Sequence, residues 1–172
     1  RSSAASDVYK RQVLGGAMFR DFAIVATAFG AEMDALKRAG WVGALSVVLG
    51  VVLSFVTGAV VAIGFGFTDA VSISTIGAGA ATYIVGPVTG TALGADSAVI
   101  ALSVAAGLVK AILVMVATPL VAKRIGLNNP QSALIYGGLM GTTSGVAAGL
   151  AATDPKLVPY GAMTATFYTG VG

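Results

Sequence analysis

Residues 71–95 read VSISTIGAGAATYIVGPVTGTALGA, and this stretch decides the fold. It is apolar and uncharged, yet five glycines and one proline interrupt it. The pair Gly86-Pro87 would break a helix near its middle or end, because proline lacks the N–H that a helix needs. Non-helical backbone is tolerated at membrane depth only where it is buried in protein or lines a water-filled cavity. We therefore predict a broken helix inside a membrane protein.

Long apolar runs lie on both sides of this stretch. Residues 41–67 carry no charge, and residues 97–122 carry only Lys110. A membrane-spanning helix needs about 20 apolar residues, so we expect two spans here and the start of another over residues 157–172. Residues 126–152, GLNNPQSALIYGGLMGTTSGVAAGLAA, form a second broken segment. The predicted fold class is an all-α membrane protein with two glycine-rich re-entrant segments.

The composition supports a membrane protein and excludes several kinds of chemistry. Charged residues make up 10% of the chain, and the mean hydropathy is +0.91; a soluble domain averages roughly 25% charged residues. Cysteine and histidine are both absent. This excludes a disulfide framework, the usual zinc ligands and histidine-based catalysis. Because no paired carboxylates, nucleophile–base set or phosphate loop is present either, we predict that the chain is not an enzyme.

Both ends of the sequence differ from what a membrane core should show. Residues 1–12 are polar and charged, so we expect a non-native leader there and a partial transmembrane core over residues 13–172; a genuine interfacial leader is the alternative. The leader supplies part of the net charge of +3, and we predict no nucleic-acid partner. The last apolar run stops abruptly, so we expect a fragment.

The two broken segments share a nine-residue pattern. Residues 86–94 and 141–149 both fit G-x-x-[ST]-G-x-A-x-G, at an offset of 55 positions. A repeat of this kind is typical of secondary transporters. The alternative is coincidence in a glycine-rich composition.

The positions of the basic residues indicate that the two segments enter the membrane from opposite sides. Lys37-Arg38 precedes the first span and Lys123-Arg124 follows the second. Because basic residues gather at the cytoplasmic ends of spans, residues 71–95 must enter and leave on one side, with Asp69 and Asp96 at the external feet. The second segment then enters from the cytoplasm, which gives an inverted repeat. The competing interpretation is that both segments simply cross.

The tips of such hairpins are the predicted substrate site. The first N–H groups of a half-helix are free and carry partial positive charge, so they bind an anion. Glycine allows close approach of the ligand, and hydroxyls add directional hydrogen bonds. Seven residues have these properties: Gly86, Thr89, Gly90, Thr142, Thr143, Ser144 and Gly145. The alternative is helix packing by small residues.

Lys110 is the eighth candidate, because it lies at the centre of a predicted span. A charge at that depth costs roughly 2.5–3.5 kcal/mol on insertion scales, so the side chain should face the protein interior and have a partner. That partner is either a substrate carboxylate or a structural group such as helix carbonyls. No metal ligands can be assigned from the sequence.

Nearly the whole chain from residue 13 resembles the large subunit of the bacterial malonate:sodium symporter, the MadM family. The likeness lies in residues 20–30 (RDFAIVATAFG), 77–90 (GAGAATYIVGPVTG), 106–115 (AGLVKAILVM), 138–155 (GLMGTTSGVAAGLAATDP) and 158–169 (VPYGAMTATFYT). The resemblance implies a multi-pass protein of the bacterial inner membrane. It also implies the dicarboxylate malonate as substrate, Na⁺ as coupling ion, no cofactor, and a small second membrane subunit, MadL, as partner.

Two other functions remain open at this point. One is a membrane subunit of a Na⁺-translocating decarboxylase, and the other is a scaffold subunit that does not transport. A decarboxylase subunit would favour an acidic residue deep in a span rather than a lysine. We therefore expect a secondary active transporter surrounded by membrane lipid.

Overall fold

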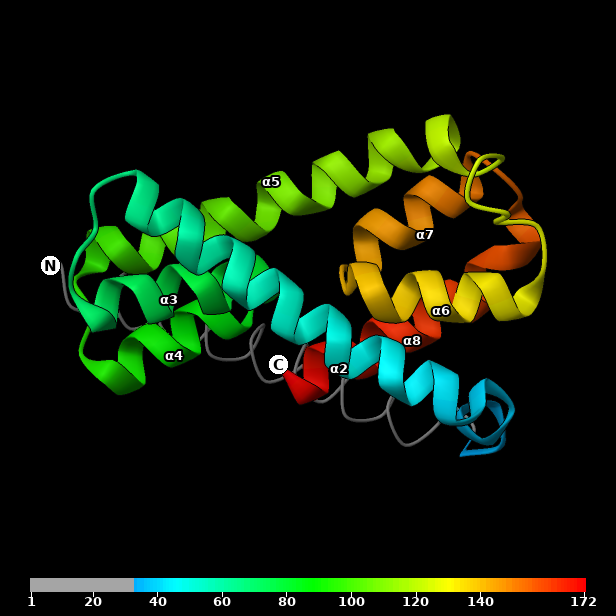
Figure 1. Cartoon of the computed structure of the whole chain (residues 1–172), viewed down its shortest axis with the longest axis horizontal. Coiled ribbons are helices and arrows are strands. Elements are labelled where there is room, and N and C mark those ends of the chain that lie inside the picture. The colour runs from blue at the N-terminus through cyan, green and yellow to red at the C-terminus, as the bar shows by residue number, and fades with distance from the viewer. Residues whose placement is uncertain (1–32) are drawn as a thin grey trace, which may run out of the picture. The chain divides into compact units, whose positions relative to one another are not determined.

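A computed structural model describes residues 33–172, and within that range the chain is helical with no strand. Its elements are α2 (Met33–Gly64), α3 (Ala70–Ala81), α4 (Val85–Leu93), α5 (Ser97–Val121), α6 (Pro130–Met140), α7 (Thr143–Ala151), the 3-10 turn η1 (Pro155–Leu157) and α8 (Val158–Val171) (Figure 1). The predicted all-α fold class is confirmed. The predicted leader, residues 1–12, lies outside the described range.

Two of the described helices are long and apolar enough to cross a membrane. They cover Gly40–Gly64 of α2 and Ser97–Val121, the whole of α5. Gly40 has a left-handed φ of 61° and separates the first turns of α2 from the apolar part. Most apolar side chains of both helices are exposed, including Trp41 at 80%, which suits surfaces that face lipid.

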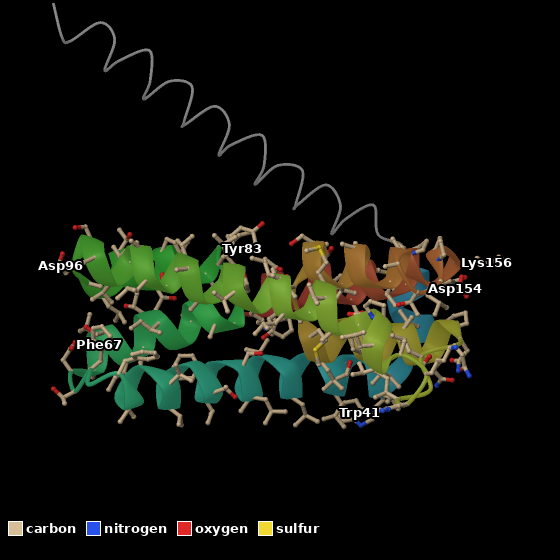
Figure 2. The ribbon with its side chains drawn as sticks, turned by 90° about the horizontal axis from the view of Figure 1, so that it is seen from above. Trp41, Phe67, Tyr83, Asp96, Asp154 and Lys156 are labelled. Atoms are coloured by element: carbon tan, nitrogen blue, oxygen red, sulfur yellow. The ribbon has the colours of Figure 1, made fainter. Side chains whose placement is uncertain are left out.

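The first broken segment folds as a hairpin of two short helices. Asp69 caps α3 by accepting a 2.7 Å hydrogen bond from the N–H of Ser72, and this bond lowers the pKa of the Asp69 carboxyl. The chain turns at residues 82–84, and α4 then returns along α3 and α5. Figure 2 places Phe67 and Asp96, at the two feet, at one end and Tyr83 near the middle.

The position of this break differs from the prediction. Gly86-Pro87 does not break the helix but lies in the first turn of α4, which begins at Val85. Proline is tolerated there because the first-turn N–H groups have no partner within the helix. The break falls instead at Thr82, whose backbone is extended.

The second broken segment also folds as a hairpin, but it enters from the opposite end. Asn129 caps α6 with a capping box, and Gly141 ends α6 in a left-handed conformation. Helix α7 (Thr143–Ala151) then runs back toward Asp154 and Lys156, which Figure 2 shows at the end away from Asp96. Two spans, each followed by a hairpin, are therefore arranged as the predicted inverted repeat.

The register of this repeat is not that of the shared nine-residue pattern. Gly86 lies inside α4, whereas its partner in the pattern, Gly141, lies after the end of α6. Helices α4 and α7 begin 58 positions apart, at Val85 and Thr143, rather than 55. The pattern is therefore the coincidence of composition given above as its alternative, and the repeat exists at the level of helices.

Apolar clusters stabilise each end of the helix bundle, and small residues allow the helices to pack closely in the middle. Ala62, Ile76 and Val99 form the cluster at the feet of the first hairpin. A larger cluster, which includes Leu150 and Leu157, lies at the opposite end. Between them, glycines of the hairpins touch the backbones of α2, α5 and α8. Close backbone approach through small residues is the usual way in which membrane helices associate.

Labelling from the two sides of the membrane tests this topology. The sequence has no cysteine, so single-cysteine variants give a clean signal. We expect Thr68→Cys and Ser97→Cys to react with an impermeant maleimide from one side, and Lys123→Cys and Lys156→Cys from the other, because all four are exposed. Reaction of Thr68→Cys and Ser97→Cys from different sides would show that residues 71–95 cross the membrane.

Candidate functional site

The tips of the two hairpins meet around one cavity of about 40 Å³. Its lining combines the turn of the first hairpin, the centre of α5, the turn of the second hairpin and the end of α8. These residues are Ala81, Thr82, Tyr83, Ile84, Gly107, Lys110, Gly141, Thr142, Thr143, Ser144 and Thr169. A cavity at the point where two oppositely directed hairpins meet is the position expected for the substrate site of a secondary transporter.

At the first tip, Thr82 accepts hydrogen bonds from the backbone N–H groups at the start of α4. The Thr82 hydroxyl accepts a hydrogen bond of 3.1 Å from the N–H of Ile84. The Thr82 carbonyl accepts two more, from Val85 at 3.1 Å and from Gly86 at 3.3 Å. This helix end therefore has little capacity left for an anion.

The second tip has more free donors. Thr142 caps α7 with a long hydrogen bond of 3.4 Å, which its hydroxyl accepts from the N–H of Gly145. The N–H groups of Thr143 and Ser144 belong to the first turn, where a helix provides no backbone partner. Both residues border the cavity. The start of α7 is thus the better of the two helix ends for a carboxylate.

Lys110 brings a positive charge to the same cavity. Its Nζ donates hydrogen bonds to Ser54 Oγ at 2.9 Å, Ala81 O at 2.9 Å and Tyr168 Oη at 3.2 Å. Ala81 is the last residue of α3, so the ammonium meets the negative end of a helix dipole. The structural pairing with helix carbonyls that we gave as an alternative is therefore present, although Lys110 also lines the cavity.

Tyr168 of α8 connects the two tips. Its side chain is fully buried and donates a 3.1 Å hydrogen bond to the carbonyl of Gly50 in α2. Its ring packs against Gly141, where an added Cβ would lie 2.3 Å from the ring carbons. The Lys110 Nζ lies 4.8 Å from the centre of the same ring. One aromatic side chain thus touches the second tip directly and the first tip through Lys110.

Four of the eight predicted site residues lie at this cavity. Lys110, Thr142, Thr143 and Ser144 line it together, from α5 and from the second tip. Thr142 is buried, whereas Ser144 is exposed. These four residues supply one ammonium, three hydroxyls and the free start of α7.

The other four predicted residues lie outside the lining: Gly86, Thr89, Gly90 and Gly145. The three glycines are buried in helix contacts. An added Cβ at Gly86 would lie 2.6 Å from Ser103 Oγ, and one at Gly145 would lie 2.6 Å from Ala111 O. In these contacts the three glycines allow helices to approach, which is the packing role given above as the alternative.

The structure brings several residues to this centre that were not predicted from the sequence. Thr82 and Tyr83 lie in the middle of the first broken segment. Their central position could have indicated that they belong to the tip. Ser54 and Tyr168 had no such signal, because they lie 56 and 58 positions from Lys110 along the chain. Only the packing of three helices brings them together.

A second, larger cavity is less suited to an anion. It has a volume of about 940 Å³ and is lined mostly by apolar side chains of α2 and α5, such as Leu53, Val61 and Leu113. Lys110, Ser54 and Thr57 also line this cavity, but the apolar wall around them offers a carboxylate no further compensation for its lost hydration. The small cavity between the hairpin tips is therefore the candidate site.

Comparison with known proteins gives one family. The family model described as malonate/sodium symporter MadM subunit matches residues 7–172. The match includes residues 7–12, which belong to the predicted leader. No curated protein and no solved structure matches the chain significantly.

Proposed function

This chain belongs to the malonate/sodium symporter MadM subunit family, and on that premise we propose that it carries malonate across the bacterial inner membrane with Na⁺. In this proposal it is the translocating subunit, works beside a small MadL-like membrane subunit and catalyses no covalent reaction. The observation that carries the proposal is the meeting of the two hairpin tips at one cavity that contains Lys110 and the start of α7.

The charges around the cavity suit a small dicarboxylate. One carboxylate of malonate binds at the N–H groups of Thr143 and Ser144, with the Thr142 and Ser144 hydroxyls beside it. The second carboxylate receives the ammonium of Lys110. Hydrogen bonds from a charged donor are about twice as strong as neutral ones, and the low dielectric at this depth strengthens them further.

The small volume of the cavity supports a movement of the hairpin tips during transport. A water molecule needs about 10–15 Å³ of such volume, so 40 Å³ holds about three or four waters, and a bound malonate would fill it. The two hairpins enter from opposite ends, and their tips line the same cavity. Movement of one tip away from the other would open the site to one side of the membrane at a time, as alternating access requires.

Uptake by proteoliposomes tests the function. The transporter and its small partner subunit are reconstituted, and labelled malonate is supplied with and without an inward Na⁺ gradient. We expect accumulation that requires the gradient and no biotin-carrying or carboxylase component. Accumulation that depends on such a component would favour the decarboxylase subunit, and absence of malonate binding would favour the scaffold.

The Ser144 hydroxyl should contribute to malonate affinity. We expect Ser144→Ala to raise the KM for malonate about tenfold or more, because a hydrogen bond to a charged group is worth about 1.5–3 kcal/mol. Membrane insertion should not change, since Ser144 is exposed. Ser97→Ala is the matched control, as it removes an exposed serine hydroxyl at a hairpin foot. Equal KM values in the two variants would remove Ser144 from the site.

A further inference from the structure

We propose that the oxygen atoms around the Lys110 ammonium form the site of the coupling cation, and that Lys110 fills this site while no substrate is bound. The inference rests on the proposed symport of malonate and Na⁺. It adds the position of the cation and the reason why cation and substrate depend on each other.

Three oxygens from three separate elements converge on one point. Ser54 Oγ comes from α2, Ala81 O from the end of α3 and Tyr168 Oη from α8, and all lie 2.9–3.2 Å from the Lys110 Nζ. Hydroxyl and carbonyl oxygens are the ligands that a hard cation such as Na⁺ prefers, and unwound half-helix ends are where transporters bind such ions. The set therefore has the chemistry of a cation site.

The Ala81 carbonyl and the Tyr168 hydroxyl also have the polarity that a cation requires. The Ala81 carbonyl lies at the C-terminal end of α3, where the helix dipole is negative. Tyr168 donates its own proton to Gly50 O at 3.1 Å, so the lone pairs of its oxygen can face the positive charge. The face of the Tyr168 ring lies 4.8 Å from Nζ and adds a cation–π attraction.

The ammonium has a second possible partner only when substrate is present. Lys110 lines the cavity that contains the start of α7, and its flexible stem allows Nζ to turn toward a carboxylate bound there. That movement would leave three oxygens at membrane depth without a positive charge, and Na⁺ can replace it. Binding of malonate thus creates the Na⁺ site, and by linkage Na⁺ strengthens malonate binding to the same extent.

Removal of the tethered charge tests the site without any transport measurement. In Lys110→Met the side chain keeps its bulk and loses its charge, so the oxygens are free for Na⁺. We expect Na⁺ to stabilise the substrate-free variant against heat with an apparent Kd at least about tenfold lower than for the wild type. Choline at equal ionic strength should have no effect. A Na⁺ response no stronger than that of the wild type would overturn the proposal.

Ligand oxygens are then removed one at a time. In the Lys110→Met background, Tyr168→Phe and Ser54→Ala should each abolish most of the Na⁺ response. Tyr136→Phe is the matched control, because Tyr136 is also a buried phenol, bonded to Thr118 at 2.7 Å in a different cluster. An undiminished response in Tyr168→Phe and Ser54→Ala would place the ion elsewhere.

A variant that keeps Lys110 tests the site even if Lys110→Met fails to fold. Ser54→Ala alone should raise the Na⁺ concentration for half-maximal malonate uptake about tenfold. No change in the Na⁺ dependence would contradict the proposal. Failure of the wild type to take up malonate would overturn the proposed function instead, since Na⁺ binding to Lys110→Met requires no transport.

Discussion

Lys110→Ala is expected to reduce malonate uptake by a factor of about 30 or more. Truncation of one partner of a buried charge pair costs about 2–5 kcal/mol, and each 1.4 kcal/mol is tenfold. In this variant one malonate carboxylate would enter the membrane interior with no positive side chain beside it. The measurement is the initial rate of labelled malonate uptake at equal amounts of inserted protein.

The control for this prediction is Lys156→Ala. Lys156 is exposed at a hairpin foot and should leave uptake unchanged. Lys110 also bonds to Ser54, Ala81 and Tyr168, so its loss weakens the contact between α3 and α8. Folding must therefore be compared by size exclusion in detergent. Normal uptake by folded Lys110→Ala would exclude the lysine from both substrate binding and the proposed coupling.

Gly79→Ala and Gly137→Ala are expected to prevent stable folding. An added Cβ at Gly79 would lie 2.1 Å from the backbone oxygen of Ser103, and one at Gly137 would lie 2.0 Å from that of Gly161. Backbone atoms cannot move aside as a side chain can, so α3 must separate from α5, and α6 from α8. Overpacking in a tight core costs typically about 1–3 kcal/mol, and contacts this short should exceed the upper end of that range.

The matched control is Gly64→Ala, at the end of α2. An added Cβ there meets no atom within 4 Å, and alanine is the better helix former by about 1 kcal/mol. We expect Gly64→Ala to melt at the wild-type temperature or slightly above it, whereas Gly79→Ala and Gly137→Ala lose the folded species. Thermal melting in detergent, followed by fluorescence and size exclusion, measures both effects. Equal melting temperatures would contradict the close packing of the hairpins.

Local properties of the sequence were sufficient for the spans and for the existence of two hairpins. The two long apolar runs, with Lys110 as their single charge, required membrane helices, since no soluble surface could be made from them. Glycine in the broken segments and the two basic pairs indicated entry from opposite sides. Asp69, Asp96 and Asn129 are the N-cap residues of α3, α5 and α6, a position that their residue types favour. Each of these features depends on residues that are close together in the chain.

The exact position of the helix break in residues 71–95 and the function of each glycine depended on tertiary contacts. Gly86-Pro87 looked like a helix break, yet Pro87 is compatible with the first turn of α4. Gly86, Gly90 and Gly145 had the residue type of a ligand-binding tip, but they pack against other helices. A small residue that permits close approach looks the same in the sequence whether the neighbour is a substrate or a helix.

By itself, the sequence determined a helical membrane protein with two glycine-broken segments and one lysine deep in a span, because length, charge and helix-breaking residues act locally. It favoured entry of the two segments from opposite sides. Only the tertiary structure decided which hairpin tip keeps free N–H groups and which oxygens surround Lys110. Those outcomes depend on contacts between residues more than fifty positions apart, such as Lys110 with Ser54 and Tyr168. Such contacts form only when the helices pack together, and no local pattern specifies them.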